Sequence, residues 1–564
     1  MRAADSANKR ATRVMYGGAA VAFALALCMV LTACKGRTRQ TVGSAKPAEP
    51  AEPAYGDTLV QGSIGDASVL IPMRAGDSAS HAVASTIFDG LLTYDKNLED
   101  FEPRLAKSWD VSKDGLEITF HLRKDVKWQD GQPFTTADIK FGFDTIRDPK
   151  TLTAYAEDFN QVSELRVQDK YTFTAVYPKP FAPALGSWGN LVVLPKHLLQ
   201  NEDINTTEFG RHPVGLGAYK FDSWKTNEQI SVISNHDYYR GRPYLDRLVW
   251  RIIPDQQTMF LELKGGGIDL TGLTPIQFKR QTETESFRSR FNKYTYLANG
   301  YTYLGYNLKL PLFQDARVRR ALTHAIDKQE IIEGVLLGLG QATEGPYKPG
   351  TYWVNDKLQP YAYDPDEAKA MLAEAGWTDS DGDGILDKDG KKFSFELITN
   401  NGNEQRLKTA TIIQRRLKKI GVDVRIKTLE WSAFINDYID KRRFEAVILG
   451  WSQGPDPDLY DIWHSSKTGV KEFNFVSFKN EEADEMLEKG RRTFDKEERK
   501  RYYDRLQKIL YEEQPYTFLY VAQSLIAVQS RIHGIEPAPA GIAYNQERWF
   551  VPQGLQRHTI TQGP

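Results

Sequence analysis

The sequence predicts an α/β protein, and three observations support that fold class. In the second half of the chain, apolar runs of strand length alternate with amphipathic stretches of helical period. The first half adds alternating apolar and polar residues, which are typical of half-buried strands. The chain has 564 residues, of which 41% are hydrophobic, so it can fill several cores. This length corresponds to about two to four domains.

The elements of the first half are short. Alternation over residues 116–122 predicts a half-buried strand, and the apolar pattern resumes at Val126 and Trp128, so we expect a hairpin there. A helix should start at a cap formed by Thr136 and end before Pro149. Further strands are expected at 171–177, 229–234 and 247–253.

A β-α-β-α-β run is predicted in the second half. Its elements fall at residues 393–397, 406–420, 422–426, 431–441 and 446–449. Such a run forms a parallel sheet, and ligands of open sheets bind beyond the carboxyl ends of the strands. Trp431 and Trp451 follow two of those ends, so both are candidate walls of a ligand site. The alternative is that they are ordinary core tryptophans.

Helix starts are visible elsewhere in this half. Asp364 followed by Pro365 and two acidic residues is typical of a capped helix, and Gly376 ends it. Asp315 opens another amphipathic helix. The charge-rich stretch 481–513 predicts a pair of solvated helices.

The N-terminus has the pattern of a secretion signal. Lys9, Arg10 and Arg13 precede an apolar stretch over 15–30, and a Leu-Thr-Ala-Cys run ends at Cys34. The run resembles the bacterial lipoprotein box. This resemblance implies that residues 1–33 are removed and that acylated Cys34 holds the protein on a membrane. The alternative is an uncleaved signal anchor, because the stretch approaches the length that spans a bilayer.

The body that follows should be displayed outside the cytoplasm. Residues 35–57 are polar and proline-rich, as in a semi-extended spacer. Cys28 and Cys34 are the only cysteines, so the mature body has no disulfide and no thiolate metal site. Of the 73 basic and 74 acidic residues, four and one lie in 1–33, which leaves a formal charge of −4. This balance lacks the basic footprint of a nucleic-acid-binding protein.

One motif suggests catalysis. Residues 450–454 read Gly-Trp-Ser-Gln-Gly, which matches the nucleophile elbow of serine hydrolases around Ser452. Pro455 and Pro457 interrupt the helix that an elbow requires. The sequence has no H-x-x-x-H pair and no glycine-rich phosphate loop. We therefore expect a binding protein with no catalytic residue and no cofactor.

A second motif suggests calcium. Asp379, Asp381, Asp383 and Asp387 match the first nine positions of a calcium loop. Gly390 stands at the twelfth position, where such loops use a bidentate glutamate. The favoured alternative is an acidic hairpin tip, so calcium remains open and no other metal is expected.

Several sequence blocks, in order, carry a family resemblance. They are DGLLTYD from Asp89, EPRLAKSWDVSKDGLEITFHLRKDVKWQDGQPFTTADIKFGFD from Glu102, HPVGLGAYKFDSW from His212, YNLKLPLFQDARVRRALTHAIDKQEII from Tyr306 and GWSQGPDPDLYDIWHSS from Gly450. Over residues 57–545 the chain resembles the extracellular solute-binding protein family 5, the dipeptide- and oligopeptide-binding lipoproteins of ABC transporters.

The resemblance implies a two-lobed periplasmic-binding-protein fold of the large, three-domain type II variety. Domain I would comprise 57–85, 206–305 and 526–564, domain II 86–205 and domain III 306–525, after a signal over 1–33 and a tether over 34–56. Hinges would lie near Thr86, Asn205, Tyr306 and Ser524. The implied protein is a monomer that captures peptides, oligopeptides before dipeptides, between its lobes. It would deliver them to a membrane permease and its ATPase.

The resemblance also indicates ligand contacts, at Thr274, Tyr303, Trp431, Trp451, Gln453, Gly454 and Asp456. In the best-known peptide binders, an aspartate three residues after the tryptophan matching Trp451 grips the peptide amino group. Gly454 stands at that place here. Either Asp456 takes over this contact or the ligand lacks a free amine in that place, and the alternative role for Asp456 is to cap a turn before Pro457. Lost terminal anchors are compatible with longer peptides held mainly by their backbone, or with a different solute.

Other functions remain open at this stage. Tryptophan platforms also suit an oligosaccharide, which makes a sugar binder the second candidate. A lipoprotein that has lost transport and acts as a sensor or chaperone is a third. A serine hydrolase acting through Ser452 is the last.

Overall fold

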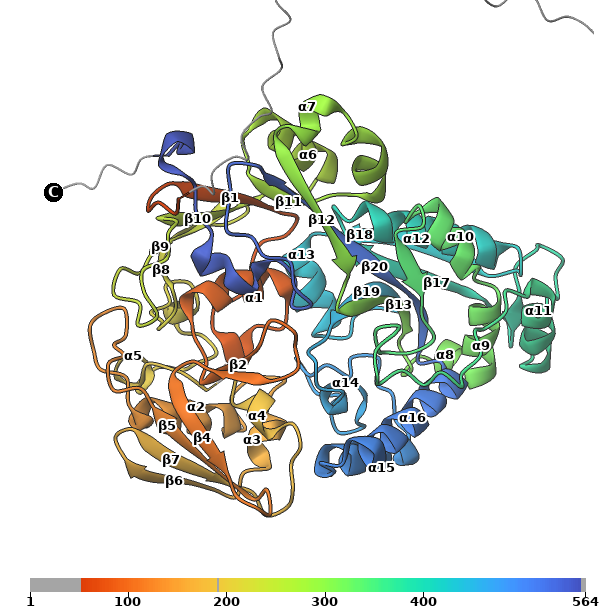
Figure 1. Ribbon diagram of the computed structural model, residues 1–564. Helices are drawn as coiled ribbons and strands as arrows, with labels where there is room; N and C mark the ends of the chain where they lie inside the picture. Colours follow the sequence, from red (N-terminus) through yellow and green to blue (C-terminus); the bar gives the residue numbers. More distant parts are fainter. Residues whose placement is uncertain (1–51, 190–191, 559–564) are drawn as a thin grey trace, which may run out of the picture. The chain divides into compact units, whose positions relative to one another are not determined.

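A computed structural model describes residues 52–189 and 192–558 of the chain (Figure 1). From Glu52 onward the chain forms one folded unit. The expected signal, the acylated Cys34 and most of the spacer lie outside the described residues. Among the described helices, none is both long and apolar enough to cross a membrane.

Twelve strands form the main sheet, in the order β18-β17-β19-β13-β20-β11-β1-β10-β9-β8, with β12 and β14 also paired to β20. Their bounds are β1 Thr58–Ser63, β8 Tyr219–Lys225, β9 Gln229–Ser234, β10 Arg247–Ile252, β11 Leu270–Gly272, β12 Phe291–Leu297, β13 Gly300–Tyr306, β14 Gly340–Ala342, β17 Ser394–Asn400, β18 Asp423–Leu429, β19 Ala446–Ser452 and β20 Tyr516–Gln529. β20 lies in the middle of this order, where it pairs with β13 and β14 on the side of residues 300–521 and with β11 and β12 toward β1, so it links the two halves of the molecule.

The predicted β-α-β-α-β run is confirmed. β17 pairs in parallel with both β18 and β19, and α12 (Glu404–Lys418) connects β17 to β18. Gly421 follows this helix with φ of +82°, a left-handed conformation that glycine adopts without strain. A short helical turn, α13 (Trp431–Ala433), continues as a π-helix (Phe434–Ile439) before β19. The three strands end at Asn400, Leu429 and Ser452, each three residues later than predicted. Trp431 therefore follows the end of β18, as predicted, whereas Trp451 lies within β19, and the prediction that it follows a strand end is wrong.

Capped helices are also confirmed. The Asp364 carboxylate accepts hydrogen bonds from two backbone N–H groups at the start of α11 (Pro365–Glu374). Asp315 caps α9 (Ala316–His324) in the same way. These side chains satisfy N–H groups that the helix itself cannot bond.

A separate four-stranded sheet occupies the first half, in the order β4-β5-β7-β6. Its bounds are β4 Ala106–Val111, β5 Glu117–Leu122, β6 Glu164–Asp169 and β7 Thr172–Val176. The expected hairpin of 116–122 with Val126 and Trp128 is wrong, because β5 pairs with β4 and β7 instead. The apolar pattern at Val126 and Trp128 reflects their burial in the core and not a second strand of this hairpin. α2 (Thr136–Arg147) begins with a capping box at Thr135, one residue before the predicted cap.

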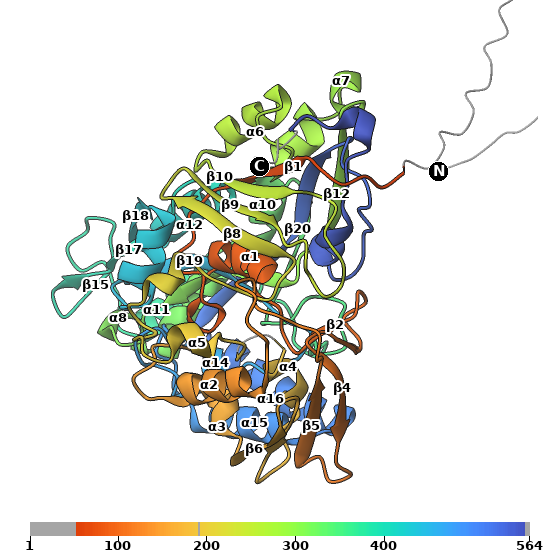
Figure 2. The ribbon, with the colours of Figure 1, turned by 90° about the vertical axis from the view of Figure 1, so that its left-hand side faces the viewer.

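Two sets of buried residues divide the unit into lobes. Lobe A is defined here by the core that joins residues 59–250 to 528–551. Lobe B is defined by the cores of residues 301–521. A smaller core over 253–291 lies at β11 and β12. The two views of the ribbon agree that β20 runs from lobe B into lobe A (Figures 1 and 2).

The remaining elements belong to these lobes. Lobe A carries α1 (Ser78–Ile87), β2 (Leu92–Tyr94), β3 (Phe101–Pro103), α3 (Ala156–Asn160), α4 (Ala184–Ser187) and α5 (Lys196–Leu199), and lobe B carries α8 (Pro311–Gln314), α10 (Lys328–Gly334), β15 (Asp387–Lys388), β16 (Lys391–Lys392), α14 (Tyr460–Trp463), α15 (Glu481–Arg492) and α16 (Lys496–Glu513). α6 (Gln256–Gly265) and α7 (Glu285–Arg288) cover the small core. The predicted helix pair over 481–513 is confirmed as α15 and α16.

Candidate ligand-binding site

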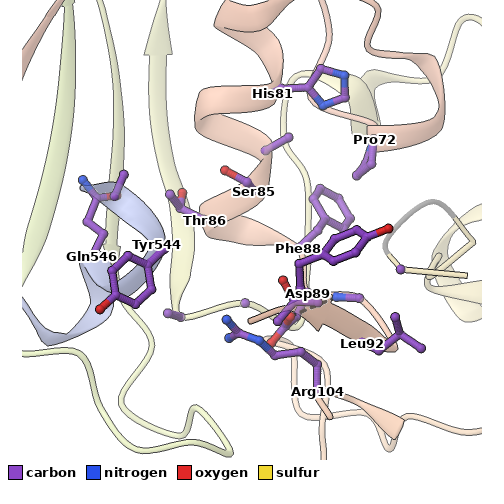
Figure 3. A pocket seen from close by; sticks show the side chains of 18 of the residues that line it. Pro72, His81, Ser85, Thr86, Phe88, Asp89, Leu92, Arg104, Tyr544 and Gln546 are labelled. Carbon is purple, nitrogen blue, oxygen red and sulfur yellow. Dashed lines mark hydrogen bonds between the residues drawn. The ribbon is translucent and has the colours of Figure 1, made fainter. Parts of the chain in front are cut away.

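A cavity of about 450 Å³ lies beside α1 (Figure 3). Its wall combines α1 and the loop after it, the turn around Gly217, the segment 543–547 and, from lobe B, Gly454 and Pro455. Tyr544 and Gln546 lie on one side of it, and Phe88 and Leu92 on the other. This volume is within the range of pockets that hold small-molecule or peptide ligands.

Polar side chains make up about half of the wall, and they include the charged groups Asp89, Arg104 and Glu547. The Asp89 carboxylate accepts hydrogen bonds from the hydroxyls of Tyr238 at 2.8 Å and Tyr239 at 2.7 Å. Burial, and then the Asp89 charge, raises the pKa of Tyr238 well above its usual value, so it remains a donor. The Tyr219 hydroxyl is buried without a hydrogen-bonding partner among the described residues. The wall thus combines apolar surface with charged, amide and hydroxyl side chains.

Gly454 leaves this cavity open toward lobe B. The residue is exposed and lines the cavity. A Cβ atom added at Gly454 would meet no heavy atom within 4 Å. An acidic side chain at this place would project into free space, so its absence here leaves room for a ligand.

The Asp456 carboxylate already has hydrogen-bonding partners within the protein. Its carboxylate accepts two hydrogen bonds from Arg499 of α16, at 2.7 and 2.9 Å. It also accepts the backbone N–H of Asp458 at 2.8 Å, which caps the turn around Pro457. Of the two roles expected for Asp456, the turn cap is present, and a contact with a ligand amine would require the pair with Arg499 to break.

Trp431 and Trp451 reach lobe A in different ways. Trp431 lies directly against Gly65, where a Cβ atom would come within 2.6 Å of the ring, and its Nε1 donates to Asp77 at 3.4 Å. The Trp451 ring packs on Phe473 with centroids 5.2 Å apart, and Phe473 packs on Tyr155 of lobe A at 5.4 Å. Both tryptophans therefore lie where the two lobes meet.

The other expected contacts are placed elsewhere. Tyr303 is fully buried and stacks on Tyr516 with centroids 3.8 Å apart. Thr274 is buried and exchanges hydrogen bonds with Gln277 in a turn. The Gln453 backbone donates to Asn299 at 2.9 Å, and its buried Nε2 has no partner among the described residues. The cavity wall includes none of these three, so their ligand role stays a prediction.

Ser452 does not sit in an elbow. β19 continues through Ser452, and the next helix, α14, begins at Tyr460. The Ser452 hydroxyl donates to the Asn299 carbonyl at 3.5 Å. A nucleophile elbow needs a helix immediately after the serine, so this geometry does not support nucleophilic activation.

A lysine occupies the acidic loop. Lys392 Nζ lies 2.6 Å from Asp381, 3.0 Å from Asp383 and 4.0 Å from Asp387. Asp379 accepts the backbone N–H groups of Gly382 and Gly384. The hydrogen bonds that Lys392 donates to Asp381 and, next in effect, to Asp383 raise the pKa of Lys392. An internal ammonium group thus supplies the positive charge that calcium would bring.

We expect calcium to leave the melting temperature of the wild-type protein unchanged, because Lys392 competes for the same oxygens. The measurement is thermal unfolding with and without calcium. Lys392→Met provides the matched variant, and a calcium-dependent rise confined to this variant would identify the lysine as the occupant. A calcium-dependent rise in the melting temperature of the wild-type protein would show that Lys392 does not prevent calcium from binding.

Sequence patterns missed a buried charge cluster between the lobes. Arg491, on α15, is only 3% exposed although the helix reads as solvated. Its guanidinium contacts Asp158 of lobe A at 2.5 Å and Asp458 of lobe B at 2.7 Å. Lys467 lies nearby, 3.4 Å from Glu157 and 3.9 Å from Asp461. A regular charge pattern on α15 cannot reveal an acid 333 residues away.

Asp461 in this cluster carries a testable pH dependence. Burial, and then the charge of Asp158, raises the pKa of Asp461 from 3.8 to about 8. A raised folded-state pKa means that the ionised carboxylate opposes folding, so stability should fall as pH rises from about 4 to about 8. We expect Asp461→Asn to flatten the fall in melting temperature between about pH 5 and pH 8.5. The exposed Asp437→Asn is the control, and equal slopes for both variants and the wild type would contradict the assignment.

Comparison with known proteins identifies the fold. The family model described as "Bacterial extracellular solute-binding proteins, family 5 Middle" matches residues 100–472. The chain belongs to this family. As a family 5 protein it is a substrate-binding protein of the two-lobed periplasmic-binding-protein fold, and the expected fold class is confirmed.

Relatives of this family 5 protein are found among both sequences and structures. The oligopeptide-binding protein AppA of Bacillus subtilis is 34% identical over 538 residues, which cover 93% of this chain and 97% of AppA. The AppA structure with a nonapeptide matches 89% of this chain and 100% of its own, at 33% identity and a TM-score of 0.84. NikZ of Campylobacter jejuni, in complex with Ni(L-His), gives 29% identity, 88% and 99% coverage and a TM-score of 0.80. DppA of Helicobacter pylori, in complex with the peptide STSA, is 27% identical. The match covers 89% of this chain and 99% of DppA, with a TM-score of 0.80.

Proposed function

We propose that this family 5 protein captures peptides, longer than dipeptides, between lobe A and lobe B. It acts as the extracytoplasmic binding component of an ABC importer and hands its ligand to the permease. AppA, at 34% identity, and the peptide complexes of AppA and DppA support the peptide as ligand. The protein functions by binding, without catalysis of its own.

The observation that carries the proposal is the open end of the cavity at Gly454. A short peptide gains from a charged anchor at its terminus, which fixes its length. Here Gly454 supplies no charge and Asp456 is paired with Arg499, so no anchor blocks the chain at this place. The cavity of about 450 Å³ can then receive further residues. Backbone hydrogen bonds would hold such a ligand without reading its sequence.

Acylation of Cys34 is part of the same proposal. The lipoprotein-like run before Cys34 would tether the binding unit to a membrane, and the spacer of residues 35–57 would let a single protomer reach the permease. Mass spectrometry of the mature N-terminus tests this point. A diacylglycerol-modified Cys34 supports the tether, and an intact Met1 contradicts it.

Thermal unfolding tests the choice of ligand. Residues 52–564, the folded unit, are mixed in turn with a dipeptide, a pentapeptide, a nonapeptide, an oligosaccharide and nickel with L-histidine. A ligand that binds only the folded protein raises its melting temperature by mass action. We expect a larger rise with the longer peptides than with the dipeptide. A rise with the oligosaccharide or the nickel complex alone would overturn the proposal.

A further inference from the structure

The charge cluster around Arg491 joins two parts of the molecule that have separate cores. Asp158 belongs to α3, whose Phe159 is buried in the core of lobe A. Asp458 precedes α14, whose Trp463 is buried in the core of lobe B. The Arg491 guanidinium touches both carboxylates, and it is therefore a bridge between independently packed units.

Backbone and aromatic contacts reinforce this bridge. The Ala182 backbone N–H of lobe A donates to the Arg491 carbonyl at 2.8 Å. The guanidinium carbon lies 4.9 Å from the ring centroid of Phe181 in lobe A and 4.1 Å from that of Tyr460 in lobe B. Arg491 thus contacts both lobes through its charge, its backbone and its planar face, which is the contact set that suits arginine.

The bridge is distinct from the candidate ligand cavity. Neither Arg491 nor any of the lobe A and lobe B groups that it contacts lines the cavity of about 450 Å³. Phe494, two residues after α15, also reaches lobe A, because a Cβ atom on Gly115 would come within 2.6 Å of its ring. A set of contacts outside the cavity therefore joins the two lobes.

We propose that Arg491 and Asp158 form a latch that keeps the lobes closed in a fraction of molecules that hold no ligand. A ligand can shift an open–closed equilibrium only by its difference in affinity for the two states. An ion pair that does not involve the ligand therefore determines the fraction of closed molecules before any ligand binds. The same pair must break before a captured ligand leaves. This second consequence rests on the proposed function, whereas the first does not.

Asp158→Asn is the sharpest variant. It removes the charge on the lobe A side only, and Asp458 remains to pair with Arg491 inside lobe B. Because Arg491 and Asp458 keep their 2.7 Å pair, the change leaves neither of these two buried charges without a partner. Asp158→Glu keeps the charge and should preserve closure. Asp144→Asn, an exposed acid of lobe A paired with Lys140, is the matched control for the loss of one negative charge.

Closure can be read by fluorescence energy transfer. The folded unit contains no cysteine, so Lys113→Cys in lobe A and Lys496→Cys in lobe B give specific labelling sites. Both lysines are exposed and lie near the contact of Gly115 with Phe494. In residues 52–564 without ligand, we expect a high-transfer population that Asp158→Asn reduces about tenfold relative to the open one. The Asp144→Asn and Asp158→Glu variants should keep that population.

Unchanged transfer in Asp158→Asn, or a ligand-free wild type that is wholly open, would overturn the latch. A melting temperature equal to that of the wild type rules out misfolding as the cause of a change. The dissociation rate of a fluorescent nonapeptide gives a second readout, and Asp158→Asn should raise it by about tenfold. A protein that binds no peptide but still opens in Asp158→Asn would retain the latch and refute the proposed function, so the two failures are distinguishable.

Discussion

Arg531→Met is expected to lower the free energy of unfolding by about 3–5 kcal/mol, the range for one partner removed from a buried ion pair. Arg531 is 5% exposed and follows β20. Its guanidinium pairs with Asp269 at 2.8 Å and with Asp57, and both acids are almost fully buried. The variant would leave two carboxylates without a cation. Urea unfolding followed by circular dichroism measures the change.

The position of this pair explains the size of the effect. Asp57 precedes β1 and also accepts the backbone N–H groups of Arg557 and His558 near the other end of the chain. Asp269 precedes β11, so two distant segments meet at one guanidinium and a third joins them through Asp57. Arg317→Met is the matched control, because Arg317 is 48% exposed and its pair with Asp315 should be worth about 0–1 kcal/mol. Equal losses for the two variants would show that the buried pair has no special weight.

Gly454→Trp should weaken the binding of a nonapeptide by about a hundredfold, or about 2.7 kcal/mol. Gly454 lines the cavity, and free space surrounds the position of its missing Cβ. An indole ring placed there would fill volume that the ligand needs, and close-packed interiors tolerate such overfilling poorly. Isothermal titration calorimetry with wild-type and variant proteins measures the difference.

Gly265→Trp supplies the control for this variant. Gly265 is also exposed, has no heavy atom near the position of a Cβ and lies at the end of α6, away from the cavity. It should bind the nonapeptide as the wild type does. If Gly454→Trp binds the nonapeptide with an affinity within twofold of the wild type and of Gly265→Trp, the peptide lies elsewhere. If Gly454→Trp still binds a dipeptide, the additional residues of the longer ligand lie at Gly454.

The fold could be predicted from the sequence wherever the residues of one element determine its type and its ends. The strands β17, β18 and β19 and the helix between the first two combine regular periodicity with clear ends, such as Gly421. Asp364 identified its helix because capping is a property of adjacent residues. The hairpin at 116–128 failed because β5 has partners on both sides, and alternation says nothing about which strand pairs with which.

The candidate site was predictable only in part, for the same reason. Trp431 follows a strand end as the sequence predicts, but Trp451 lies within β19. The contact of Trp431 with Gly65 joins residues far apart in the chain, which no local pattern indicates. Asp456 reads equally well as an anchor or a cap until Arg499 is seen to pair with it. Arg491 has the spacing of a surface residue, and only the approach of lobe A buries it. Interactions between lobes leave no local periodicity to read.

Native mass spectrometry of residues 52–564, purified without denaturation, shows what the protein holds between lobe A and lobe B. A binding protein that closes over its ligand retains it when dissociation is slow compared with purification. We expect a series of bound masses that, once released, resolve into peptides of several residues and varied sequence. A single non-peptide mass, or a ladder spaced by hexose units, would contradict this expectation and assign the space between lobe A and lobe B to another solute.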